Sequence, residues 1–250
     1  MKKLFKSFLF LLIVSLVFTT SAFAKSEHAK KSLVALGDSI PFGYNLEDEN
    51  AHPSRDAFPF KIGDEADLRV RDLGIPGLKT DGLLTLLQHD QEFREAVRHA
   101  DYITLNIGNN DLLAALKQAY VSSNGNPQLL NYYLMQYIQS SNVFANLSQI
   151  VTEIRQLTNA PVLLYNFYNP FQLTDPLHYL AKNVLPEING QLNGFVALAN
   201  LQLQNIVLGD AYTAFGENQA KYVLANDIHP TLAGHTKLAE VGLLALGLKK

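Results

Sequence analysis

Short apolar runs alternate with longer amphipathic stretches along most of the chain. Five runs are apolar or rich in β-branched residues, and most of them end at a glycine or a polar turn. This pattern is typical of strands buried in a parallel sheet. The sequence therefore predicts strands at residues 33–36, 68–73, 102–107, 161–165 and 205–208.

The stretches between these runs carry apolar residues at helical spacing, as at Leu134, Ile138 and Leu147. They predict helices at residues 83–99, 112–121, 129–157, 185–203 and 231–246, the first with a break near Asp90. Strands that alternate with helices imply right-handed crossovers. We therefore expect one three-layer α/β domain at residues 25–250, a five-stranded, mainly parallel sheet flanked by helices.

The first 24 residues follow a different pattern. Three lysines precede an apolar run at residues 8–18, which is shorter than the roughly 20 residues that a membrane span needs. Ala22-Phe23-Ala24 fits the small-x-small cleavage pattern of a secretory signal peptide. We predict that residues 1–24 are cleaved and that the mature bacterial protein is secreted or held at the cell surface, without a stable membrane span. The alternative is an uncleaved anchor.

Net charge and cysteine content argue against several classes of function. Removal of residues 1–24 would leave 17 basic and 23 acidic residues, a net charge of −6. Nucleic-acid binding usually needs a basic face, so we expect no nucleic-acid partner. The chain has no cysteine, which excludes a thiol nucleophile and any cysteine-ligated metal.

Small and polar residues follow four of the predicted strands, and a further polar segment precedes the last predicted helix. In open parallel sheets, ligands bind in the crevice beyond the carboxyl ends of the strands. These segments would therefore share one cleft. The four strand-end segments are Gly-Asp-Ser at 37–39, Gly-Ile-Pro-Gly at 74–77, Gly-Asn-Asn-Asp at 108–111 and Tyr-Asn-Pro at 168–170. The segment before the last helix is Asn-Asp-Ile-His-Pro at 226–230.

Ser39 and His229 are the candidate pair for nucleophilic catalysis. A serine hydroxyl becomes a useful nucleophile when a base lies within hydrogen-bond reach, and imidazole suits neutral pH. Pro230 would suit the first position of the last helix, which would leave His229 on the preceding loop. The alternatives are a helix N-cap for Ser39 and a structural loop role for His229.

Two further groups could donate hydrogen bonds to a developing oxyanion, namely the Asn110 side-chain amide and the Gly77 backbone N–H. The alternative is that both belong to ordinary turns, which are rich in glycine and asparagine. We interpret Asp38 and Asp111 as braces of the loops rather than as reacting groups.

Four motifs in this order, around Ser39, Gly77, Asn110 and His229, resemble the SGNH (GDSL-type) hydrolase family, which is named for its Ser, Gly, Asn and His. The segment Tyr168-Asn169-Pro170-Phe171 also looks like a loop of the secreted bacillus-type esterase/lipase branch. The resemblance implies a flavodoxin-like sheet of order 2-1-3-4-5 and no cofactor. It also implies that Ser39 is the nucleophile and His229 the base, and that Ser39, Gly77 and Asn110 form the oxyanion hole.

One position departs from the family pattern. The family places an aspartate three residues before the histidine, where this chain has Asn226, and Asp227 lies two residues before His229. Either residue could orient the imidazole. An amide would orient the ring but would not stabilise imidazolium as a carboxylate does. The third member of the catalytic set is therefore Asn226 or Asp227.

The sequence thus predicts a serine esterase or lipase that hydrolyses small-molecule or lipid esters with short to medium acyl chains. The alternatives are an O-acetylesterase of a cell-wall or plant polysaccharide and, from another class, a non-catalytic surface-binding protein on the same fold. Oligomeric state is left open. One apolar stripe and one tyrosine cluster could line an acyl groove, although such stripes more often face a core. They are Leu83, Leu84, Leu86 and Leu87, and Tyr132, Tyr133 and Tyr137.

Overall fold

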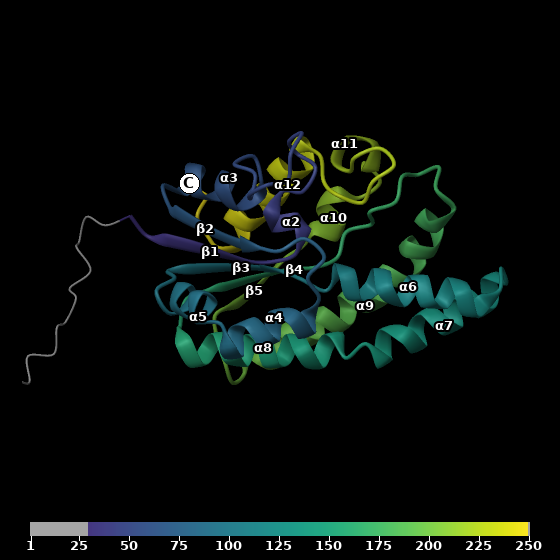
Figure 1. Ribbon diagram of the computed structural model, residues 1–250, viewed down its shortest axis with the longest axis horizontal. Helices are drawn as coiled ribbons and strands as arrows, with labels where there is room; N and C mark the ends of the chain where they lie inside the picture. The colour runs from purple at the N-terminus through teal and green to yellow at the C-terminus, as the bar shows by residue number, and fades with distance from the viewer. Residues whose placement is uncertain (1–29, 250) are drawn as a thin grey trace, which may run out of the picture.

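The computed structural model describes residues 30–249 and contains a five-stranded sheet in which every neighbouring pair of strands is parallel (Figure 1). The strand order is β2-β1-β3-β4-β5, which confirms the predicted flavodoxin-like arrangement. The predicted signal peptide lies outside the described residues. Each strand lies within one residue of its predicted bounds: β1 (Ser32–Gly37), β2 (Arg69–Gly74), β3 (Tyr102–Asn106), β4 (Val162–Tyr165) and β5 (Ile206–Gly209).

Helices cover both faces of the sheet and make the predicted three layers (Figure 1). One face packs against α3 (Phe58–Ala66), α10 (Ala211–Phe215), α11 (Gln219–Tyr222) and α12 (Leu232–Ala245). The other face packs against α4 (Thr80–His89), α5 (Gln91–Arg98), α6 (Asn109–Ser123), α7 (Pro127–Ser140), α8 (Val143–Leu157) and α9 (Pro176–Asn200). The pair α6 and α7 extends beyond the carboxyl end of the sheet as an arm (Figure 1). A short helix, α2 (Ser39–Phe42), directly follows β1.

The two cores follow from the alternation of side chains along the strands. In β4, Leu163 and Tyr165 pack with α3 and α12, whereas Val162 and Leu164 pack with α8 and α9 on the opposite face. All four are almost fully buried, as expected for a strand covered on both faces. The Tyr165 hydroxyl donates a hydrogen bond of 2.8 Å to a backbone carbonyl of α12, which ties that helix to the sheet.

The helix boundaries were predicted less well than the strands, and α4 and α6 each begin three residues before the predicted start. The predicted helix at 129–157 is two helices, because Asn142 between them has a left-handed backbone with φ 57°. The helix predicted at 185–203 is α9, which begins earlier, at Pro176 after the Asp175 cap, and contains Pro186. Pro230 is not helical: it pairs with Val223, and the Thr231 hydroxyl caps α12 instead. The predicted break at Asp90 is confirmed, since its carboxylate caps α5.

Gly37, at the end of β1, is required by close packing. A Cβ at this position would overlap the backbone carbonyl of Asn106 on β3. The glycine therefore allows β1 and β3 to approach at the point where both strands leave the sheet. In the described part of the chain, no helix combines the length and apolar character that crossing a membrane requires.

His235 on α12 is a fully buried histidine whose ring makes one hydrogen bond within the described residues. Its Nδ1 accepts from the Phe58 backbone N–H at 3.2 Å, so the neutral ring carries its proton on Nε2. Burial lowers the pKa of His235 from 6.5 to about 3. The unfolded chain therefore takes up a proton at this residue below about pH 6.5, whereas the folded chain does not.

We expect His235 to lower stability progressively in mild acid. The contribution of the neutral His235 ring to the free energy of unfolding is fully present above pH 6.5. It falls by about 1.4 kcal/mol per pH unit below that value, or by about 2 kcal/mol at pH 5. Burial raises the pKa of Asp38 and of Asp72 to about 7, so these two groups increase the free energy of unfolding as the pH falls. Their effect is opposite in sign to that of His235.

The effect of His235 is therefore measured as the difference in free energy of unfolding between wild type and a His235 variant, because the contributions of Asp38 and Asp72 are common to both proteins. Urea unfolding of wild type and His235→Asn, in which the amide oxygen can replace Nδ1 as acceptor, should show the wild-type advantage shrinking by about 2 kcal/mol from pH 7 to pH 5. An advantage that does not change with pH would contradict a neutral buried ring.

Candidate active site

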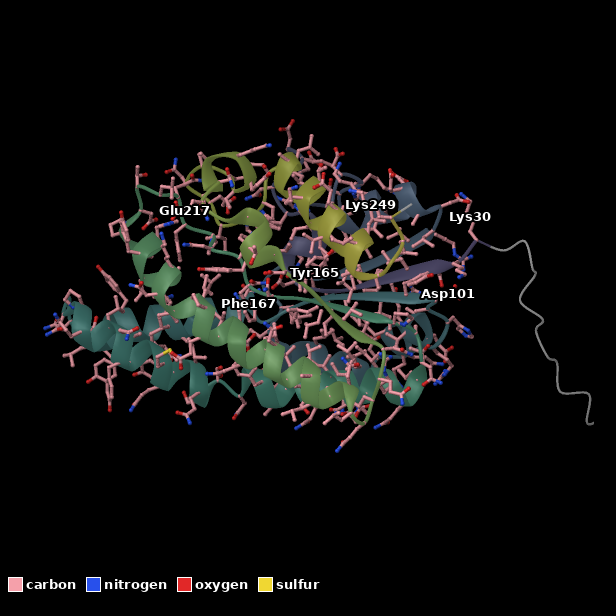
Figure 2. All side chains as sticks on the ribbon, turned by 180° about the vertical axis from the view of Figure 1, so that it is seen from behind. Lys30, Asp101, Tyr165, Phe167, Glu217 and Lys249 are labelled. Atoms are coloured by element: carbon pink, nitrogen blue, oxygen red, sulfur yellow. The ribbon has the colours of Figure 1, made fainter. Side chains whose placement is uncertain are left out.

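The polar segments that follow the strands meet at the carboxyl edge of the sheet. In Figure 2, Tyr165 and Phe167 mark this edge where β4 ends, and Lys30 and Asp101 mark the opposite, amino edge. The register aligns Gly37 of β1 with Gly74 of β2 and with Asn106 of β3, so the segments after these strands start side by side.

Ser39 is fixed in place by the turn that starts α2. The Asp38 carboxylate accepts a hydrogen bond from the Ile40 backbone N–H at 3.0 Å and another from the Asn109 amide at 3.1 Å. Ser39 itself is 9% exposed, so its hydroxyl lies at the floor of the site. The cap of α2 is thus Asp38, and the serine is the first helical residue rather than the cap.

His229 is presented by a tight loop between α11 and α12. The loop is closed by the Val223–Pro230 bridge and by a hydrogen bond of 2.9 Å from the Leu224 N–H to the His229 carbonyl. At its tip, His229 Nε2 lies 2.9 Å from Ser39 Oγ, although the two residues are 190 positions apart. This distance is that of a hydrogen bond between the hydroxyl and the imidazole nitrogen.

Asp227 occupies the other side of the imidazole. Its Oδ1 lies 2.7 Å from His229 Nδ1 and also accepts from the Ile228 backbone N–H, while its Oδ2 accepts from the Asn45 amide at 2.7 Å. Partial burial raises the pKa of Asp227, but the hydrogen bonds from Asn45, Ile228 and His229 outweigh it, and the net pKa is lowered. The carboxylate is therefore ionised at neutral pH.

Of the two residues that could orient the ring, the structure brings Asp227 to it. Asp227 and Ser39 engage both ring nitrogens, which leaves neither for Asn226. Asn226 instead has a left-handed backbone with φ 58°. This conformation favours asparagine or glycine and turns the chain so that the next residue faces the imidazole.

The candidate oxyanion donors lie on two neighbouring segments that are joined by a hydrogen bond. The Asn110 amide donates to the Leu78 carbonyl at 3.0 Å, directly after Gly77, and its second amide proton has no acceptor among the residues that the structure describes. Within residues 30–249, neither the Gly77 nor the Ser39 backbone N–H has an acceptor. Gly77 has φ 80°, and a Cβ there would meet only open space, so its conformation rather than packing favours glycine.

Asp111 also connects the segments that follow β2 and β3. Its carboxylate accepts from both the backbone N–H and the hydroxyl of Thr80, at 3.0 and 2.8 Å, and the Asn146 amide donates to that hydroxyl at 3.0 Å. Burial raises the pKa of Asp111, and the Thr80 hydrogen bonds act against this rise. These contacts fit the interpretation of Asp111 as a loop brace.

Tyr168, on the loop after β4, holds the histidine loop in place. Its hydroxyl donates to the Ile228 carbonyl at 2.8 Å, between Asp227 and His229, and its ring stacks on Phe215 at 4.5 Å. The sequence singled out this segment only by resemblance. The bond to residue 228 and the contact of Asn45 with Asp227 join positions far apart in the chain, and no local pattern in the sequence indicates them.

An apolar cavity of about 90 Å³ opens beside Ser39 and His229. It is lined mainly by leucine and other apolar side chains of α6, α7 and α9, together with Phe167 and Phe171. The stripes proposed for an acyl groove do not line it. Leu83 and Leu87 are fully buried in the core under α4, and Tyr132 is exposed on α7.

A family model described as the GDSL-like lipase/acylhydrolase family matches residues 35–237. The chain belongs to this family. The match covers most of the domain, including Ser39, Asn110 and His229. The resemblance inferred from the four motifs is therefore confirmed, and the protein is a member of a family of ester hydrolases.

Individual proteins are similar to this chain in sequence or in structure. The uncharacterized protein YpmR of Bacillus subtilis is 24% identical over 248 residues, which cover 92% of this chain and 90% of YpmR. The lipase Lip_vut3 from a goat rumen metagenome has a TM-score of 0.68 at 24% identity, over 86% of this chain and 97% of the lipase. Phospholipase A1 from Streptomyces albidoflavus NA297 also has a TM-score of 0.68, at 15% identity, over 87% of this chain and 100% of that enzyme. These similarities show a shared GDSL hydrolase fold.

We expect Tyr168→Phe to lower kcat for ester hydrolysis about tenfold with little change in KM, because the histidine loop loses a fixed point while the substrate cavity is retained. The free energy of unfolding should fall by about 1 kcal/mol, the usual value of one such hydrogen bond. Steady-state kinetics and urea unfolding measure both.

Tyr212→Phe is the matched control, since the Tyr212 hydroxyl makes no hydrogen bond within the described residues and the variant should behave as wild type. A Tyr168→Phe protein with wild-type kcat would show that this bond does not position His229.

Proposed function

We propose that the protein is a serine ester hydrolase that works through an acyl-serine intermediate, with Ser39 as nucleophile and His229 as general base. The observation that carries this proposal is the continuous pair of hydrogen bonds from Ser39 Oγ to His229 Nε2, at 2.9 Å, and from His229 Nδ1 to the Asp227 carboxylate, at 2.7 Å. A nucleophile, a base and a group that orients the base are thus in contact.

In the first step, Ser39 Oγ attacks the ester carbonyl carbon and its proton passes to His229 Nε2. The tetrahedral intermediate then collapses, the bond to the alcohol oxygen breaks, and the His229 imidazolium donates its proton to that oxygen. In the second step, His229 removes a proton from water as the water attacks the acyl-serine, and the acid is released with Ser39 restored. The ionised Asp227 stabilises the imidazolium in both steps.

We assign the oxyanion hole to the backbone N–H groups of Ser39 and Gly77 and to the Asn110 side-chain amide. The two backbone groups have no other acceptor in the part of the chain that the structure describes, and the amide has a proton free. Each such donor is worth about 3–4 kcal/mol of transition-state stabilisation where it has been measured in other hydrolases.

The cavity favours carboxylic esters with short to medium acyl chains, or lipid esters, as substrates. A polysaccharide O-acetylesterase would need polar and exposed aromatic side chains to bind sugar, whereas the surface beside Ser39 leads into apolar side chains. A non-catalytic binding role would leave the paired Ser39, His229 and Asp227 without a purpose. We further propose that the protein acts outside the cell or at its surface, after removal of residues 1–24.

Ser39→Ala should lower kcat/KM for p-nitrophenyl acetate and butyrate by at least about 1,000-fold, because the acyl-serine can no longer form. Circular dichroism should match wild type, and the free energy of unfolding should lie within about 1 kcal/mol of it, since Ser39 Oγ contributes a single hydrogen bond. Turnover close to wild type in the folded Ser39→Ala protein would end the proposal.

The choice between the two candidate orienting residues can be tested separately. Asp227→Asn should lower kcat by about 100- to 10,000-fold, because an amide neither stabilises imidazolium nor holds the same ring tautomer. Asn226→Gly, which tolerates the same left-handed backbone, should keep kcat within about threefold of wild type. If the two variants exchanged these effects, Asn226 and not Asp227 would be the orienting residue.

A further inference from the structure

The cavity beside Ser39 has its polar groups at one end only. Ser39, His229, Asn109 and Asn110 lie where the strands end, and the Tyr168 hydroxyl is already bonded to Ile228. The remaining lining is apolar, and none of the lining residues is Asp, Glu, Lys or Arg. A ligand that fits this cavity is therefore polar at one end and apolar along the rest of its length.

Three helices form the apolar part of the cavity. The α6 helix starts beside Ser39 and contributes Leu112, Leu113 and Leu116, which are spaced to lie on one face. Because an α-helix rises about 1.5 Å per residue, Leu116 lies about 10 Å along the axis from Asn109, roughly the length of an extended eight-carbon chain. The facing walls are Leu134 and Ile138 of α7 and, from α9, Leu177, Leu180, Ala181, Val184, Leu185 and Ile188.

The walls suit an apolar chain better than water. The volume of about 90 Å³ is several times the roughly 10–15 Å³ that one water needs, but a water in a cavity also needs two to four polar partners. The leucine and isoleucine side chains offer none. Protein interiors are otherwise close-packed, so a space of this size and character next to a nucleophile is a specific feature of this fold.

We propose that this cavity between α6, α7 and α9 binds the acyl chain of the ester and selects linear chains of roughly six to ten carbons, the range that matches its length along α6. The ester carbonyl lies at the polar end beside Ser39, and the chain runs along α6 toward Leu116. The proposal rests on the proposed function, since it takes Ser39 as the attacking group. It adds that chain length on the acid side of the ester determines the substrate.

The direct test is a series of p-nitrophenyl esters from acetate to laurate, each below its aggregation concentration. We expect kcat/KM to rise at least about tenfold from acetate to octanoate as methylenes enter the apolar walls, and to fall again beyond about ten carbons. A maximum at acetate with a steady decline for longer chains would overturn the assignment of the cavity.

A variant tests where the chain lies. Ala181→Phe places a ring in the cavity and should lower the octanoate-to-acetate ratio of kcat/KM at least about tenfold. Ala197→Phe, on the exposed face of the same helix and outside the cavity lining, should leave that ratio unchanged. A misfolded protein would lose both activities together, so the ratio reports on the cavity. An unchanged ratio in folded Ala181→Phe would contradict the proposal. If this variant does not fold, the chain-length profile of the wild-type protein alone tests the proposal.

The two proposals fail in different ways. If acetate hydrolysis depends on Ser39 but octanoate is not preferred, the ester hydrolase stands and the acyl cavity does not. If Ser39→Ala hydrolyses every ester as fast as wild type, the proposed function itself is wrong, whatever the chain-length profile.

Discussion

The hydrogen bond between Ser39 Oγ and His229 Nε2 depends on the whole sheet. The serine follows β1, an interior strand beside the edge strand β2, and the histidine lies on a loop after β5 at the opposite edge of the sheet. The parallel order 2-1-3-4-5 brings the two groups together at the carboxyl edge. Right-handed crossovers place the helices on both faces and leave the carboxyl edge open. The fold therefore serves mainly to bring two distant short segments to one edge with an accuracy of a few tenths of an ångström.

Hydrogen bonds, rather than buried ion pairs, hold the segments around this contact. Asp38 caps the helix that carries Ser39, Thr80 and Asp111 tie the segments after β2 and β3 together, and Tyr168 fixes the carbonyl of Ile228. Burial raises the pKa of Asp38 to about 7, whereas three hydrogen-bond donors lower that of Asp227. The two carboxyl groups near the histidine thus have different charge states near neutral pH. Only Asp227, which contacts the ring, is held firmly ionised.

Much of the site could be predicted from the sequence because the segments that carry Ser39, Gly77 and Asn110 each directly follow an apolar run, and the His229 segment directly precedes the last predicted helix. The strands were found to within one residue, and Ser39, Gly77, Asn110 and His229 were singled out from that position and from the family motifs. The choice between Asn226 and Asp227 could not be made, since it depends on the left-handed backbone of Asn226 within a single loop. The acyl cavity could not be predicted from the sequence either. It requires the packing of α6, α7 and α9, and the helix pattern missed the break at Asn142 and the first turns of α9.

The central claim is that Ser39 is an activated nucleophile, and covalent labelling tests it most directly. A fluorophosphonate reacts with serine hydroxyls that a neighbouring base activates. Incubation of the folded protein with such a probe, followed by peptide mass spectrometry, should give a single adduct on Ser39 that forms at least about 100-fold more slowly in His229→Ala. Failure of Ser39 to label, or labelling at the same rate without His229, would contradict the account.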